Sequence, residues 1–205
     1  MKAYFFQRIA AYFIDIILLS LVVGILTLPI PENKSATALN EELTSLNEQY
    51  LKGELSTSVY MNQSKEVTHD LAYQNVLYTI IDAVAIILYF VIFQAYRGGQ
   101  TIGKRLMHIQ VVKTDGTPAK MNDLAIRSLL IHAVLANIIL LAITVFGSKD
   151  IYFYFGNGIQ GLQGLLMIIT VFMVIFRKDG RGLHDLIAKT QVIDTRVKEM
   201  EQCEN

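Results

Sequence analysis

Long apolar stretches alternate with polar segments along this chain. A helix needs about 20 residues to cross a hydrocarbon core roughly 30 Å thick. Four stretches of the chain are apolar over about this length. They cover residues 9–28, 76–96, 126–146 and 158–176. The polar segments between and after them cover residues 29–75, 97–125, 147–157 and 177–205. The pattern predicts one all-α polytopic membrane domain over residues 1–205, with four transmembrane helices.

Composition favours the same interpretation. Hydrophobic residues make up 53% of the chain and charged residues 18%, whereas a soluble domain carries about 25% charged residues. Basic and acidic residues balance, so the net charge gives no indication of a nucleic-acid partner. The single cysteine, Cys203, excludes a disulfide framework within one chain. We therefore expect this protein to lie mainly within a lipid bilayer.

The distribution of basic residues predicts the orientation. Residues 97–125 carry Arg97, Lys104, Arg105, Lys113 and Lys120, and residues 177–205 carry Arg177, Lys178, Arg181, Lys189, Arg196 and Lys198. The segments at residues 29–75 and 147–157 are poor in cations. Cytoplasmic loops carry an excess of Lys and Arg. Both termini and the middle loop are therefore expected in the cytoplasm.

Three segments outside the spans show regular patterns. Leu39, Leu43, Leu46 and Tyr50 recur at helical spacing, which predicts an amphipathic helix in the first extracellular loop. Residues 108–113 and 190–193 alternate like strands and are rich in β-branched residues. An isolated hairpin is marginally stable in water. We therefore expect these two strands to pair with each other in a small cytoplasmic β-sheet.

Ionisable side chains inside the apolar stretches are the candidate functional residues. Asp15 lies in the first span, Asp82 in the outer part of the second and His132 in the third. A charged group in hydrocarbon costs about 2.5–3.5 kcal/mol on insertion scales, so its presence needs a reason. One hypothesis is a cation or proton site formed by these three residues. The alternative is structural: each carboxylate pairs with an arginine or hydroxyl and orients the helices.

Motifs of enzymes are missing from the sequence. We find no Walker loop, dinucleotide fingerprint, HExxH motif or nucleophile elbow. We therefore expect no catalytic residues, no cofactor and no metal site.

Several motifs in order resemble the RDD family of prokaryotic membrane proteins. They are Arg8 to Asp15 (RIAAYFID), Gly99 to Leu106 (GQTIGKRL), Val111 to Gly116 (VVKTDG), Arg127, Arg181 to Asp185 (RGLHD) and Ala188 to Val192 (AKTQV). The family is named for one arginine and two aspartates, and the resemblance assigns these to Arg8, Asp15 and Asp185. Asp185 is preferred to Asp82 because it lies inside a matching motif. The resemblance implies that Arg8 and Asp185 clamp the cytoplasmic sheet onto the span ends, with Arg127, Arg181 and His184 as further motif residues.

The resemblance also implies a function. Some members of the family are thought to act in transport, including sodium/proton exchange. We therefore expect a transporter of a monovalent cation or small solute in the bacterial plasma membrane, with Asp15 as the central carboxylate. Four spans are few for a transport path, so a homodimer or larger homo-oligomer is expected. The alternative is a non-transporting scaffold or accessory subunit that binds a partner protein through its outer loop or sheet.

Overall fold

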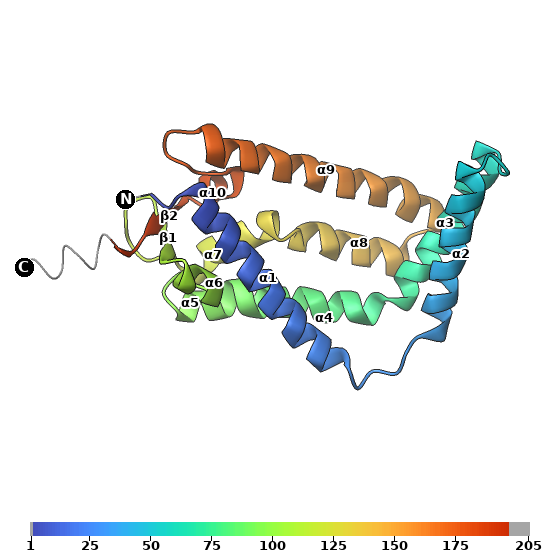
Figure 1. Ribbon diagram of the computed structural model, residues 1–205, viewed down its shortest axis with the longest axis horizontal. Helices are drawn as coiled ribbons and strands as arrows, with labels where there is room; N and C mark the ends of the chain where they lie inside the picture. Colours follow the sequence, from blue (N-terminus) through green and yellow to red (C-terminus); the bar gives the residue numbers. More distant parts are fainter. Residues whose placement is uncertain (1, 197–205) are drawn as a thin grey trace, which may run out of the picture.

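The bundle of long apolar helices is the main feature of the computed structural model, which describes residues 2–196 (Figure 1). Three helices are long and apolar enough to cross a membrane: α1 (Phe5–Thr27), the helix Val76–Tyr96, and α9 (Lys149–Phe176). The helix Val76–Tyr96 consists of α4 (Val76–Ile87), the π-helical segment η1 (Leu88–Phe93) and α5 (Gln94–Tyr96). A bent pair, α7 (Met121–Ile131) and α8 (Val134–Phe146), brings the number to four when it is counted as one span.

The third span is broken, which corrects the prediction of one continuous helix over residues 126–146. Helices α7 and α8 meet at an angle of 64°. Between them Ala133 adopts a left-handed backbone with φ of 54°, a conformation that is unfavourable for residues other than glycine. The backbone groups freed by the break need partners in a membrane, and Gln163 of α9 donates to the carbonyl of Leu130 at 2.9 Å. Since neither proline nor glycine stands at the break, hydropathy alone gave no sign of it.

The fourth span begins much earlier than expected. Helix α9 starts at Lys149, so the predicted loop at residues 147–157 is wrong and the link from α8 shrinks to Gly147 and Ser148. Ser148 caps the helix by accepting a hydrogen bond from the N–H of Ile151 at 3.3 Å. The polar start of α9 is held by ion pairs to helix α3 (Thr57–Gln74): Lys65–Asp150 at 2.9 Å and Lys149–Asp70 at 3.0 Å. These contacts between helices explain why a polar stretch continues the apolar span.

A helical hairpin lies across one end of the bundle. It consists of α2 (Lys34–Leu51) and α3 (Thr57–Gln74), and Figure 1 shows it at the end opposite the two termini. The helix predicted from the leucine spacing is present as α2. The second helix was not predicted. Tyr50 and Tyr60 stack between the two helices with ring centroids 4.3 Å apart.

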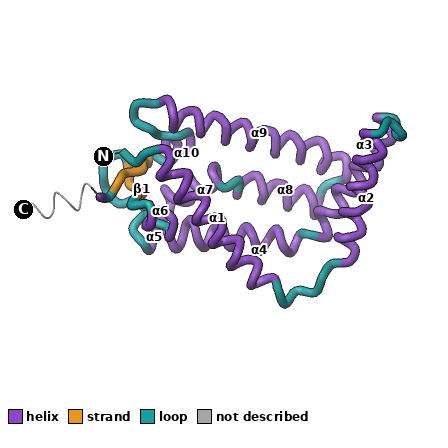
Figure 2. The backbone as a smooth tube through the Cα atoms, in the orientation of Figure 1, coloured by secondary structure: helices purple, strands orange, loops and turns teal. Residues whose placement is uncertain are grey.

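The predicted two-stranded sheet is confirmed. Strand β1 (Ile109–Lys113) pairs antiparallel with β2 (Thr190–Asp194), with Ile109 opposite Asp194 and Lys113 opposite Thr190. The N-terminal segment continues the sheet, because the N–H of Ala3 donates to the carbonyl of Val192 at 3.0 Å. Two short helices, α6 (Ile102–Leu106) and α10 (Leu183–Ile187), connect the strands to the spans. Figure 2 shows both strands beside the N-terminus, and we call this the sheet end of the bundle.

Both ends of the described chain lie at the sheet end (Figure 1). A chain whose two ends lie on the same side of a membrane crosses it an even number of times. This agrees with four spans, in which the bent pair acts as one. Which side of the membrane the sheet faces stays a prediction from the basic residues.

Candidate functional site

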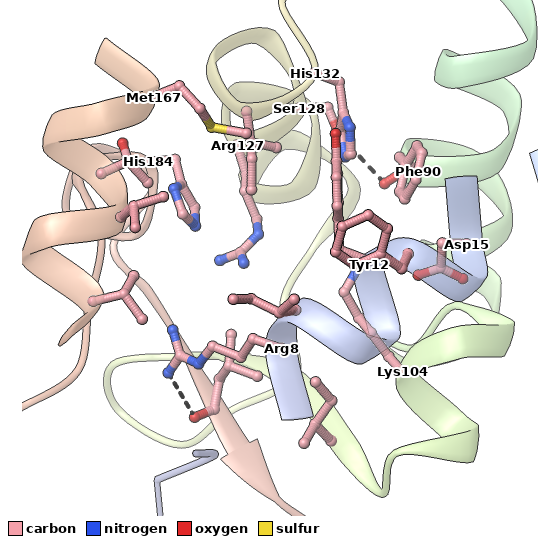
Figure 3. A pocket seen from close by; sticks show the side chains of 18 of the residues that line it. Arg8, Tyr12, Asp15, Phe90, Lys104, Arg127, Ser128, His132, Met167 and His184 are labelled. Carbon is pink, nitrogen blue, oxygen red and sulfur yellow. Dashed lines mark hydrogen bonds between the residues drawn. The ribbon is translucent and has the colours of Figure 1, made fainter. Parts of the chain in front are cut away.

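A cavity of about 240 Å³ lies at the sheet end, between α1, α7 and α9 (Figure 3). Apolar side chains form most of its wall, with Ile9, Phe13, Ile131, Met167, Val171 and Val174 among them. The acidic and basic side chains in the wall are Arg8, Asp15, Lys104, Arg127, His132 and His184. Charged groups at this depth are costly, so their partners determine what the cavity can do.

Asp185 is the most highly connected of the buried carboxylates. It is fully buried and accepts hydrogen bonds from two guanidinium groups, Arg127 Nη1 and Arg8 Nη1, the latter at 3.4 Å. Thr190 Oγ1 donates to it at 3.1 Å and the N–H of Gly182 at 3.3 Å. The last bond caps α10 at its N-terminus, where a negative charge is favourable. One carboxylate therefore joins α1, α7, α10 and β2.

The structure contains the predicted Arg8–Asp185 pair and adds a second arginine to it. The role of Arg127 in this pair was not predicted, although the resemblance had marked it as a motif residue. Arg181 lies elsewhere and pairs with Asp179 at 2.9 Å. His184 is buried in the cavity wall, with Nε2 3.4 Å from Asp185. Burial, together with the positive charges of Arg127 and Arg8, lowers the pKa of His184 well below its usual value, so its imidazole is neutral.

Two buried nitrogen atoms at this end of the cavity have no hydrogen-bond partner within residues 2–196. They are Nε of Arg8 and Nδ1 of His184. Buried polar groups are nearly always paired. The cavity therefore offers unused hydrogen-bonding capacity beside its arginines.

Asp15 forms the second buried junction. Its carboxylate accepts hydrogen bonds from Tyr89 Oη at 2.6 Å, Thr101 Oγ1 at 2.5 Å and the N–H of Gly103 at 2.8 Å. All three donors are neutral, and within the described chain no cationic group lies within ion-pair distance of it. The bonds tie α1 to the second span and to α6. The structural interpretation predicted an arginine or a hydroxyl partner, and hydroxyl groups are what the structure provides.

Gly103 explains why a glycine stands in the motif of α6. A Cβ atom there would lie 2.2 Å from the carbonyl oxygen of Ala11 and 2.9 Å from the Asp15 carboxylate. Helix α6 can therefore approach α1 closely enough for its backbone N–H to reach Asp15. Thr101 is the N-cap of α6 and accepts from the N–H of Lys104 at 3.3 Å while donating to Asp15.

The three residues predicted as a cation or proton site do not all meet. Asp15 and His132 line the same cavity. His132 stands at the break of the third span and stacks on Phe90 with ring centroids 3.7 Å apart. Asp82 is exposed on the side of the second span, is absent from the cavity wall, and makes no hydrogen bond or ion pair within residues 2–196.

Lys104 is a cavity residue that sequence reasoning missed. Its ammonium group donates to Gln94 Oε1 at 3.3 Å and lies 5.5 Å from the centre of the Phe90 ring. The sequence feature that could have indicated Lys104 is its position directly after Gly103 in a motif of the family. Phe90 and Tyr89 come from the π-helical segment, and the Phe90 carbonyl accepts from Ser128 Oγ at 3.5 Å. π-Helical segments often occur at functional sites.

No group of three His, Cys, Asp or Glu side chains that could hold a metal ion is found within residues 2–196. Cys203 lies outside the described residues.

Comparison with known proteins gives one match. The family model described as RDD family matches residues 2–189. No curated protein and no solved structure matches the chain.

The contact between α6 and α1 predicts the effect of filling Gly103. In Gly103→Ala the new methyl group must displace α6 and lengthen the hydrogen bonds to Asp15. We expect the free energy of unfolding, measured by denaturant titration in mixed micelles, to fall by about 2–4 kcal/mol. Gly161→Ala is the control, because a Cβ atom at Gly161 has nothing within 4 Å. Equal stability of the two variants would contradict the packing described for Asp15.

Lys104 predicts a pH dependence of stability. Burial and the charge of Arg127 lower the pKa of Lys104 to about 7 in the folded protein, whereas an unfolded lysine titrates near about 10.4. Between these values the unfolded state binds more protons, so stability rises with pH from about 7 to 10.

The measurement is the thermal unfolding temperature in detergent across this pH range. In Lys104→Met the unfolding temperature should rise less with pH than in the parent protein. Arg105→Gln changes the exposed neighbour of Lys104 on α6, so its unfolding temperature should rise as much as that of the parent. An unchanged slope in Lys104→Met would show that the lysine is not buried in this way.

Proposed function

The chain belongs to the RDD family of membrane proteins, and on that premise we propose that it is a transporter of a cation or small solute. The observation that carries the proposal is Asp15. It is a fully buried carboxylate in a span, it lines a cavity, and its donors are neutral. An ionisable group in the membrane is a functional candidate by default, and Asp15 forms no ion pair within residues 2–196.

The broken third span supports the proposal. The break separates 11 residues of α7 from 13 residues of α8, so it lies near the middle of the span. Transporters commonly bind solutes at such discontinuous helices, near the membrane midplane. Ile131 and His132 border both the break and the cavity. The strained backbone of Ala133 is the kind of outlier that gathers at binding and switching sites.

Proton or cation exchange at Asp15 is the specific form that we propose. Oδ1 already accepts from Tyr89 and Gly103, whereas Oδ2 accepts from Thr101 alone. A carboxylate oxygen has about two lone-pair positions, which leaves Oδ2 free to take a proton or to contact a cation.

Orientation and assembly complete the proposal. We infer that the sheet end faces the cytoplasm, because the segments rich in Lys and Arg gather there. This would place the hairpin of α2 and α3 outside a bacterial plasma membrane. We further infer a homo-oligomer. The four spans enclose a cavity of about 240 Å³ at one end of the bundle, and this cavity does not extend through the membrane as a transport path must.

The experiment is sodium or lithium flux against a pH gradient in proteoliposomes. The proposal predicts exchange by the parent protein and a loss of at least about tenfold in Asp15→Asn. Asp82→Asn is the matched control: it removes a second carboxylate from a span, but one that lies outside the cavity. Its exchange rate should equal that of the parent.

Two results would overturn the proposal. Exchange by Asp15→Asn at the parental rate would exclude Asp15 as the exchange site. A correctly folded parent that moves neither sodium, lithium nor protons would exclude cation exchange and favour the scaffold alternative.

A further inference from the structure

The end of the cavity opposite Asp15 holds more positive than negative charge. Figure 3 shows Arg8, Arg127 and His184 gathered at one end and Asp15 and Lys104 at the other. Arg8 and Arg127 share the single carboxylate of Asp185. A buried charge that is not neutralised is costly.

Two other carboxylates at the sheet end form no ion pair with Arg8 or Arg127 within residues 2–196. Asp179 is bonded to Arg177 and Arg181. Asp194 is bonded to Arg196 and Gln7. Two guanidinium groups therefore share one ion-paired carboxylate, next to the unpartnered Nε of Arg8 and Nδ1 of His184. The end of the cavity has the donors and the charge to bind an anionic group.

The remaining walls are suited to a hydrocarbon chain. Met167, Val171 and Val174 follow α9 along the cavity, and Ile9 and Phe13 do so on α1. Phe13 and Val171 are also 60% and 38% exposed on the apolar surface of their helices. The cavity thus meets the lipid-facing surface between α1 and α9, and a ligand can enter sideways from the bilayer.

The order of these groups along the spans matches a lipid. Arg8 is the fourth residue of α1 and lies near the sheet end, whereas Phe13 lies about 7.5 Å deeper on the same helix. Met167 likewise lies about 13.5 Å from the end of α9. A lipid of the adjacent leaflet would therefore place its head group at the arginines and its acyl chain toward the centre of the membrane.

We propose that this cavity binds one anionic phospholipid from the bilayer, with its phosphate against Arg8, Arg127 and His184 and an acyl chain between α1 and α9. The lipid supplies the negative charge that Asp185 alone does not provide. A zwitterionic lipid fits less well, because its ammonium group adds a positive charge beside two arginines. The proposal goes beyond transport, since the lipid completes the site whether or not Asp15 exchanges cations.

The first test is selective retention of lipid by the purified full-length protein. Phosphatidylglycerol and phosphatidylcholine with identical acyl chains are titrated onto the delipidated protein, and bound lipid is counted by native mass spectrometry. The proposal predicts one tightly bound phosphatidylglycerol, with an affinity at least about tenfold above that of phosphatidylcholine. Equal affinities, or no lipid retained, would overturn it.

The second test locates the lipid. Met167→Trp adds bulk to the apolar wall while both arginines remain in the chain, and it should weaken phosphatidylglycerol binding at least tenfold. Ile168→Trp is the matched control, because Ile168 is exposed on the same helix and is absent from the cavity wall; it should bind like the parent. Equal binding by both variants would place the lipid outside this cavity.

A competition arm separates a lipid from a soluble anion. Glycerol phosphate carries the charge without the acyl chain, so it should displace phosphatidylglycerol poorly at millimolar concentration. Full displacement by glycerol phosphate would mean that the site binds free phosphate compounds, and the lipid proposal would be wrong. Cation flux and lipid binding are measured in separate experiments. A failure of the exchange proposal can therefore be distinguished from a failure of the lipid proposal.

Discussion

The buried carboxylate of Asp185 is the interaction on which the rest of the sheet end depends. It accepts from Arg127 of the third span and from Arg8 of the first, and it caps α10 and contacts β2 through Thr190. Removing one partner from a buried ion pair costs about 3–5 kcal/mol, because the other charge is left uncompensated. The two spans, α10 and the sheet are therefore held together as one unit.

This constraint explains how a sheet of two strands persists and why a cavity forms beside it. A two-stranded sheet alone is marginal in water, but β2 is held by Arg8, which also donates to the carbonyl of Val192 at 3.3 Å. Asp15 makes the second junction by fastening α6 to α1. The cavity lies between these junctions, and its wall carries Asp15, arginine, lysine, histidine and apolar side chains.

Much of this architecture could be predicted from the sequence. Hydropathy gave the spans, alternation gave the two strands, and the motif around Asp185 gave its pair with Arg8. What could not be predicted depends on contacts between distant segments. The break at Ala133 relies on Gln163 of another span, and the polar start of α9 relies on ion pairs with α3. Asp15 and Asp82 look alike in an apolar sequence; their neighbours in the fold make one a buried junction and leave the other exposed.

A double-mutant cycle between Arg127→Gln and Asp185→Asn tests most directly whether this carboxylate joins the spans to the sheet. The free energy of unfolding is measured in mixed micelles for the parent, both single variants and the double variant. Each single variant should lose about 3–5 kcal/mol, and the double variant should lose at least about 2 kcal/mol less than their sum. The cycle of Arg127→Gln with Asp179→Asn, whose carboxylate is bonded to other arginines, should be additive. Additivity within about 0.5 kcal/mol for Arg127 and Asp185 would contradict the account.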